Sequence, residues 1–151
     1  MLMGIMLKPK PDRGTYQLAL TVQQPVAIQI GALGTHTLMP GIYIYIGRAK
    51  KGLAHRLARH QLKEKALHWH IDYLTSHPQV LIENIQLVSD DPDKECSTVN
   101  TLVSDQGYKV PIRGFGSSDC HSGCPAHLVY LIHQPPRYGR SSLQGRKRSR
   151  S

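Results

Sequence analysis

The alternation of apolar and polar positions predicts that the chain begins with short strands. Residues 15–22 alternate apolar and polar side chains directly after a glycine, which is typical of a half-buried strand. Two shorter apolar runs, 26–30 and 35–39, predict two further strands, because a glycine ends the first and a proline ends the second. The pattern therefore indicates a local meander of strands.

Residues 41–47 carry the strongest strand pattern in the chain. Their β-branched and aromatic side chains stand between two glycines. Because successive side chains of a strand point to opposite faces, Tyr43 and Tyr45 are expected on one face and the three isoleucines on the other.

Helical periodicity follows these strands. Residues 52–64 carry leucines and basic residues at turn spacing, and residues 67–77 predict a second helix with a partly buried apolar face. A strand is expected over 80–88, a helix beginning with Asp-Asp-Pro over 90–107, and a last strand over 127–132. Strands that come first and helices that follow predict an α+β fold.

Length and charge add a domain plan. The 151 residues suit one domain, with a flexible leader over 1–13, the domain over 14–134 and a basic disordered tail over 135–151. The formal net charge is +9, from 19 basic and 10 acidic residues. Six of the basic residues lie in 137–151, which holds no acidic residue. The excess favours a polyanionic partner, but the tail supplies most of it.

Cysteine usage and hydropathy bear on the compartment. Cys96, Cys120 and Cys124 make an odd count without a disulfide framework, so we expect reduced cysteines and a cytoplasmic protein. The N-terminal residues lack the basic region and the cleavage site of a signal peptide. We expect no membrane span, because that needs about 18 apolar residues in a row.

A set of polar side chains is suited to phosphodiester hydrolysis. That reaction needs a base for water, positive charge on the phosphate and help for the leaving oxygen. Taken singly, each residue fits an ordinary strand, a solvated helix face or a helix start, so only their order together favours a site. The candidates are Tyr16, Tyr45, Arg48, Arg56, His60 and Glu95.

Three short segments resemble the motifs of GIY-YIG nucleases. Residues 45–47 (YIG), followed by 52–57 (GLAHRL), resemble the second half of that pattern, and residues 14–16 (GTY) resemble the first half. Residues 41–43 spell GIY literally, yet they abut the second half. Because the two halves need adjacent antiparallel strands, we choose Tyr16 and not Tyr43 as the first-motif tyrosine.

The longer gap between the two motif tyrosines implies an inserted hairpin. With residues 68–74 (HWHIDYL), 95–96 (EC) and 114–120 (GFGSSDC), the chain resembles the Uri-type endonuclease branch, also described as domain of unknown function 123. The resemblance covers about residues 13–133. It implies a small central antiparallel sheet flanked by helices, with the hairpin between the two motif strands.

The resemblance also implies roles for the tyrosines and arginines. Tyr45 would be the general base, and Tyr16 would lie beside it and orient water or phosphate. Because a free tyrosine has a pKa of about 10, one of them is expected to be lowered by nearby cations. Arg48 and Arg56 would do this and bind the scissile phosphate.

Glu95 would hold one divalent cation, Mg²⁺ or Mn²⁺, with waters and phosphate completing the coordination. His60, one turn beyond Arg56, would contact phosphate or assist proton transfer. His68, His70 and Asp72 are compatible with a metal site, but such residues more often tether a helix by hydrogen bonds. Residues 114–119 lack the ending of a phosphate-binding loop, and we expect them to pack near the site.

A second candidate cluster is suited to zinc. Cys120, Cys124 and His127 offer two thiolates and an imidazole at short spacing, with His121 or Cys96 as a fourth ligand. The alternative is that reduced cysteines pack a loop. Because the spacing is not a paired CxxC motif, both interpretations stay open.

These observations predict a metal-dependent DNA endonuclease of low sequence specificity, acting in repair or processing of DNA. The residues do not discriminate against RNA. Two alternatives remain: a noncatalytic DNA-binding module with the same fold, and a zinc-stabilised structural or interaction domain.

Overall fold

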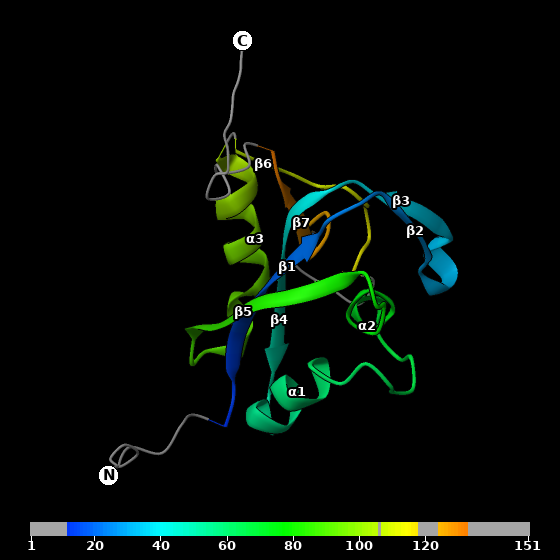
Figure 1. Cartoon of the computed structure of the whole chain (residues 1–151). Helices are drawn as coiled ribbons and strands as arrows, with labels where there is room; N and C mark the ends of the chain where they lie inside the picture. The colour runs from blue at the N-terminus through cyan, green and yellow to red at the C-terminus, as the bar shows by residue number, and fades with distance from the viewer. Residues whose placement is uncertain (1–11, 106, 118–123, 133–151) are drawn as a thin grey trace, which may run out of the picture.

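The computed structural model describes residues 12–105, 107–117 and 124–132. Most of the predicted leader and all of the predicted tail lie outside these residues. Within them the chain forms a five-stranded antiparallel sheet, a separate two-stranded sheet and three α-helices (Figure 1). The expected α+β class is confirmed.

The two motif strands lie side by side at the centre of the sheet. Strand β1 (Gly14–Val22) pairs with β4 (Gly41–Ala49) along its whole length. Strand β5 (Val80–Ser89) flanks β1, while β7 (Leu128–Leu131) and then β6 (Tyr108–Lys109) flank β4. The two segments with the longest strand patterns, β1 and β4, are therefore neighbours inside the sheet, where their apolar side chains are buried.

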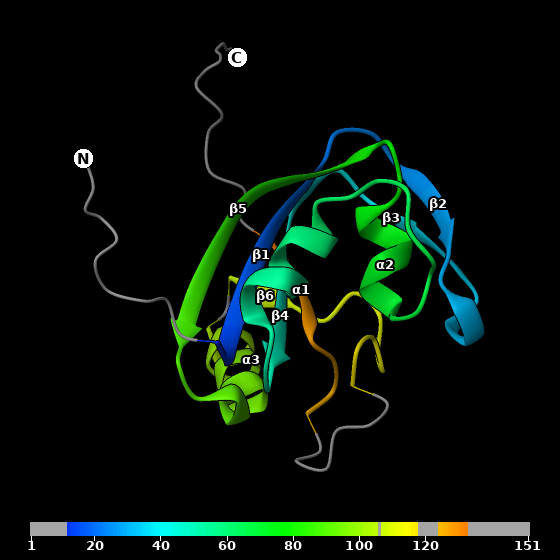
Figure 2. The same cartoon turned by 90° about the horizontal axis from the view of Figure 1, so that it is seen from below.

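The expected insertion between the motif strands is a hairpin of its own. Strand β2 (Val26–Gln29), the 3-10 helix η2 (Gly31–Leu33) and strand β3 (Thr35–Leu38) leave the main sheet and pair only with each other in the described chain. They project to one side, past β1 and β4 (Figures 1 and 2). The hairpin lengthens the connection without disturbing the central pair.

Helices cover both faces of the sheet, which explains why β4 is apolar on both of its faces. Helices α1 (Leu53–His60) and α2 (His70–Thr75) pack on the face that carries Tyr43 and Tyr45. The 3-10 helix η3 (Pro92–Lys94) leads into α3 (Glu95–Ser104), which lies on the other face of the sheet (Figure 2). There α3 packs on the isoleucines of β4.

Helices α1 and α2 are shorter than the periodicity predicts, because polar side chains satisfy their ends. After α1, the Lys65 ammonium donates hydrogen bonds to the carbonyls of Arg59 and His60. Lys65 thus satisfies the last carbonyls of α1 from beyond the end of the helix. Before α2, the Asp72 carboxylate accepts hydrogen bonds from the backbone N–H groups of His68 and Trp69.

Strand β6 is not predicted by the sequence pattern, because a strand of two residues has too little pattern to detect.

Within the described part of the chain, none of the helices has the length and apolar character needed to cross a bilayer.

Candidate active site

A cavity of about 210 Å³ opens where the central strands meet the first residue of α3. It gathers five of the six residues predicted for phosphodiester chemistry from segments up to 79 positions apart. The sixth, His60, lies behind it. The lining residues are Tyr16, Tyr45, Arg48, Arg56, Trp69, Glu95, Gly116 and His127.

The two phenols lie on one face of the sheet, on neighbouring strands. Tyr16 of β1 is opposite Gly47 of β4, and Leu18 is opposite Tyr45, so the two tyrosines are offset by one pair along the ladder. Both side chains belong to the core that α1 and α2 cover. Tyr43 is on the same face, but its hydroxyl donates to the Met39 carbonyl 2.7 Å away, and it does not line the cavity.

Gly47 lies between the two phenols because nothing larger fits there. A Cβ atom at this position would be 2.6 Å from the Tyr16 hydroxyl and 2.8 Å from Tyr45 Cε2. Strand β4 continues past this glycine to Ala49, and the turn toward α1 occurs at Gly52, with φ of 67°.

Arg56 is held at the cavity by two contacts. Its Nη1 donates to the carbonyl of Arg48 at 2.6 Å, which ties α1 to the end of β4. Its guanidinium also lies 4.5 Å from the centre of the Trp69 ring. Such stacking fixes the plane of a guanidinium, so Arg56 is positioned before any ligand arrives.

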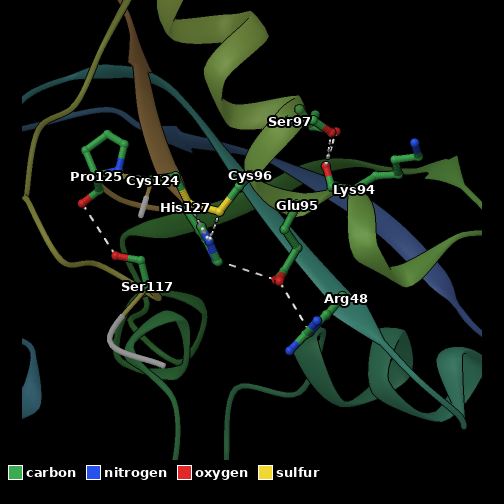
Figure 3. Close-up of a disulfide and its surroundings, with 10 residues drawn as sticks. Arg48, Lys94, Glu95, Cys96, Ser97, Ser117, Cys124, Pro125 and His127 are labelled. Carbon is green, nitrogen blue, oxygen red and sulfur yellow. Dashed lines mark hydrogen bonds and ion pairs between the residues drawn. A yellow bond between two sulfur atoms is a disulfide. The ribbon is translucent and has the colours of Figure 1, made fainter. Parts of the chain in front are cut away.

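Arg48 forms ion pairs with Glu95, at 3.3 Å, and with the exposed Asp93, at 3.4 Å. Glu95 begins α3 and is mostly buried. Burial raises the pKa of its carboxyl, and Arg48 and Arg56 oppose that rise. The cavity therefore holds one carboxylate between two guanidiniums (Figure 3 for Arg48 and Glu95).

The pKa of both phenols departs from the expectation. Burial raises the pKa of Tyr16 and Tyr45 well above 10, and the nearby Arg56 lowers each only in part. The predicted lowering by the arginines alone is wrong, because the apolar core that positions these rings also removes water from their hydroxyls. Both phenols are therefore neutral at pH 7 without further positive charge in the cavity.

His60 lies behind the cavity and reaches it through a hydrogen bond to Tyr16 and through ring contacts with Tyr45 and Trp69. It is fully buried, and its Nε2 shares a hydrogen bond of 2.6 Å with the Tyr16 hydroxyl. Burial, reinforced by Lys65, lowers its pKa to about 4, so the ring is neutral at pH 7. His60 does not line the cavity, so in this geometry its hydrogen bond positions Tyr16, and the expected contact with phosphate or help in proton transfer stays a prediction.

His127 joins the cavity from the cysteine cluster, a role the sequence did not indicate. Its Nδ1 lies 3.5 Å from Glu95 Oε2, and its Nε2 lies 3.2 Å from Cys124 Sγ (Figure 3). Burial lowers its pKa, and Arg48 adds to that. Only its proximity to Cys124 in the sequence had drawn attention to it.

Two of the three cysteines are not reduced here. Cys96 on α3 and Cys124 before β7 form a disulfide, because α3 packs beside β7 and brings their Cα atoms to 5.5 Å. The expectation of reduced cysteines is thereby corrected, since an odd count does not exclude one pair. Together with His127 they are close enough to bind a metal ion. Cys120, proposed as a ligand from the sequence, and His121 lie outside the described residues.

The histidine-rich segment has the structural role considered for it. Asp72 is fully buried and pairs with Arg59 at 2.7 Å, in addition to capping α2. His70 Nδ1 accepts a hydrogen bond from the backbone N–H of Gly116 at 2.8 Å. The glycine-rich loop therefore packs against the site as expected, although Ser118 and Asp119 lie outside the described residues.

Trp69 and Gly116 line the cavity but were not predicted as site residues. The sequence offered a weak signal for each: Trp69 lies in a predicted helix with a partly buried apolar face, and Gly116 lies in a glycine-rich loop. Neither position reveals by itself that it faces Arg56 or His127.

A family model described as domain of unknown function DUF123 matches residues 15–145. Neither a curated protein nor a solved structure matches the chain.

Proposed function

The chain belongs to the DUF123 family, whose model covers residues 15–145, and on that premise we propose that it is a metal-dependent endonuclease of the GIY-YIG type. The proposed reaction is hydrolysis of phosphodiester bonds in DNA, with low sequence specificity, in repair or processing of DNA. The family description itself assigns no function.

One observation carries the proposal: two phenols, two guanidiniums and one carboxylate converge on a single cavity. Guanidiniums bind phosphate oxygens bidentately, a carboxylate suits a hard divalent cation, and a phenol can move a proton. Ordinary core packing does not require these five groups to share one cavity, since three of them carry charge.

Glu95 is the residue that would hold the cation. Its carboxylate oxygens fit Mg²⁺ or Mn²⁺, both of which are bound by one or two carboxylates together with water and phosphate. When bound, the cation supplies positive charge for the phosphate and the leaving oxygen. Its charge also favours the ionised form of the neighbouring phenols, opposing the burial that raises their pKa.

The remaining steps belong to the side chains. Arg56, stacked on Trp69, binds a nonbridging oxygen of the scissile phosphate, and Arg48 neutralises charge beside Glu95. In its ionised form, which a bound cation would favour, Tyr45 accepts the proton of the attacking water. Tyr16, hydrogen-bonded to neutral His60, orients that water.

The surface beside the cavity suits a nucleic-acid backbone. Arg48, Lys50, Lys51 and Arg56 line a second hollow next to the first, and no acidic residue lines it among those described. Such a cluster binds phosphates through charge and reads no sequence. We therefore propose DNA as the substrate, while these contacts do not by themselves reject RNA.

A second function is favoured by the raised pKa of both phenols. Neutral phenols between two arginines would also bind phosphate without cutting it. The alternative is therefore a noncatalytic DNA-binding module that keeps the same cavity.

Supercoiled plasmid with Mg²⁺ or Mn²⁺ separates the two. The proposed nuclease nicks the plasmid with either cation and not with chelator present. Glu95→Gln abolishes nicking and retains DNA binding, while the exposed Glu83→Gln behaves like the parent protein. Binding without cleavage across both cations and several DNA structures would instead establish the noncatalytic module.

A further inference from the structure

We infer that Cys96, Cys124 and His127 form a Zn²⁺ site when the disulfide is reduced, with Glu95 fixing the histidine from behind. Bound metal and disulfide are then two alternative states of one cluster. The metal site stands whether or not the proposed nuclease activity exists. The contact between Glu95 and His127 links the zinc site to the proposed active site.

The three donor atoms already surround one point. The two sulfurs and a nitrogen of His127 all lie within 4.8 Å of one another. His127 Nε2 is 3.7 Å from Cys96 Sγ and 3.2 Å from Cys124 Sγ, so the ring edge faces both sulfurs. Tetrahedral zinc needs ligands at about 2.0–2.3 Å, which small shifts of these side chains would provide once the S–S bond is broken.

The cluster is buried, as a metal site with few ligands needs to be. His127 and Cys124 are nearly inaccessible to solvent, and Cys96 is partly covered. The three residues come from α3 and from the segment that leads into β7, two elements that pack together in the core. The protein scaffold therefore holds the ligands near one another without the metal.

Glu95 supplies the second observation. Its Oε2 lies 3.5 Å from His127 Nδ1, on the side of the ring opposite the sulfurs (Figure 3). No hydrogen bond otherwise reaches this buried nitrogen in the described part of the chain. A carboxylate behind the imidazole is the usual partner of a metal-bound histidine, because it fixes the tautomer in which the far nitrogen is free to bind.

The donor set selects the metal. Two thiolates and an imidazole are soft ligands that favour Zn²⁺ and disfavour Mg²⁺, which requires oxygen. The cavity carboxylate of Glu95 has the opposite preference. Two different ions are therefore expected on the two sides of the Glu95–His127 contact, with a water completing the zinc coordination.

The exchange between the two states conserves atoms and electrons. A dithiol reductant transfers two electrons and two protons to the disulfide, giving two thiols and an oxidised, disulfide form of the reductant. Zn²⁺ then displaces the two thiol protons and binds both thiolates and His127. Hydrogen peroxide reverses the change by taking two electrons from the thiolates, which re-forms the disulfide and releases Zn²⁺ and two hydroxide ions.

The full chain with Cys120→Ser, reduced with a phosphine under nitrogen, tests the site without the third thiol. Titration with Co²⁺ is expected to produce thiolate-to-cobalt charge-transfer absorption and tetrahedral d–d bands at one equivalent, which Zn²⁺ abolishes. Cys96→Ser and His127→Ala, made in the same background, lose these bands. His36→Ala, a histidine of the hairpin, keeps them.

Glu95→Gln measures the coupling, since loss of a partner behind a ligating histidine weakens metal binding about 10- to 100-fold. An unchanged affinity in this variant would contradict the role given to Glu95. Absence of cobalt bands in the reduced Cys120→Ser protein would overturn the site itself. This holds whether its circular dichroism matches that of the oxidised protein or differs from it, since the scaffold is proposed to hold the ligands without metal.

These titrations contain no DNA. A protein that binds Co²⁺ but never cuts DNA therefore refutes the nuclease and not the zinc site. A protein that cuts DNA but shows no cobalt bands refutes the zinc site and not the nuclease.

Discussion

At the scale of single residues, Gly47 controls the distance between the two phenols. A methyl group there would meet the Tyr16 ring at 2.6 Å, so Gly47→Ala forces one of the rings to move. We expect a loss of about 1–3 kcal/mol in the free energy of unfolding, as for other overpacked cores, and a strong loss of cleavage.

Urea denaturation and plasmid nicking measure both effects. Gly107→Ala is the matched control, because among the described residues the atom that an added Cβ meets there is Asp105 Oδ1, at 3.5 Å. A Gly47→Ala protein as stable and active as the parent would show that the phenols do not need this packing.

His60 makes stability depend on pH. Its pKa is lowered by burial from 6.5 to about 4 in the folded protein, so below pH 6.5 the unfolded chain binds the extra proton first. Stability is therefore unaffected by this group above pH 6.5 and falls as the pH drops toward 4. This lowering of the pKa corresponds to a loss of roughly 3 kcal/mol in the free energy of unfolding once the pH is below 4.

Thermal unfolding between pH 4 and pH 7 tests this expectation. The parent protein should lose more stability over this range than His60→Gln, whose side chain does not titrate. Equal pH dependence of the two proteins would mean that His60 is not held neutral in the core.

At the residue level, Tyr16 was preferred to Tyr43 because two motif halves need two strands. Tyr16 lies on the strand paired with β4 and lines the cavity, while its role in chemistry stays a prediction. Residue-level prediction failed for the phenol pKa, because burial depends on packing that the sequence does not display. It also missed Trp69, whose contact with Arg56 joins residues of different elements.

At the scale of elements, the Arg59–Asp72 pair joins α1 to α2. Asp72 is fully buried, pairs with Arg59 at 2.7 Å and caps α2 through two backbone N–H groups. Asp72→Asn leaves Arg59 without its countercharge and should cost about 3 kcal/mol in the free energy of unfolding. Chemical denaturation measures this cost.

The exposed Arg48–Asp93 pair offers the matched comparison. Asp93→Asn should change stability by no more than about 0.5 kcal/mol, since exposed ion pairs contribute little. Equal effects of the two substitutions would contradict the structural role given to Asp72.

The order and type of the longer elements could be predicted from the sequence, and their ends could not. The central strands were found because alternation over nine residues is a strong pattern. The end of α1 depends on Lys65, which acts from outside that helix, and the start of α2 depends on Asp72, whose side chain reaches back from the first turn to the backbone before it. The Cys96–Cys124 pairing depends on how α3 packs beside β7.

At the scale of the whole molecule, the basic hollow beside the cavity should make DNA binding depend on salt. Lys50 is exposed there, and Lys50→Ala should weaken DNA binding uniformly across sequences. The slope of log affinity against log salt should fall by about 0.9, because the variant neutralises one phosphate fewer. Lys109→Ala removes the same charge from the far strand β6 and should leave the slope unchanged.

Fluorescence anisotropy of a labelled duplex at several salt concentrations gives these slopes. If the two lysine variants behave alike, the hollow is not the DNA-binding surface.

The central claim is that the Tyr45 phenol performs chemistry, and single-turnover nicking of supercoiled plasmid at saturating Mg²⁺ tests it most directly. Tyr43 is the control, since it lies on the same strand and face but bonds to Met39 outside the cavity. Tyr45→Phe should lower the rate by at least about 100-fold with DNA affinity retained, while Tyr43→Phe stays within a few-fold of the parent. Equal rates for Tyr45→Phe and the parent protein, or a loss confined to Tyr43→Phe, would contradict the account.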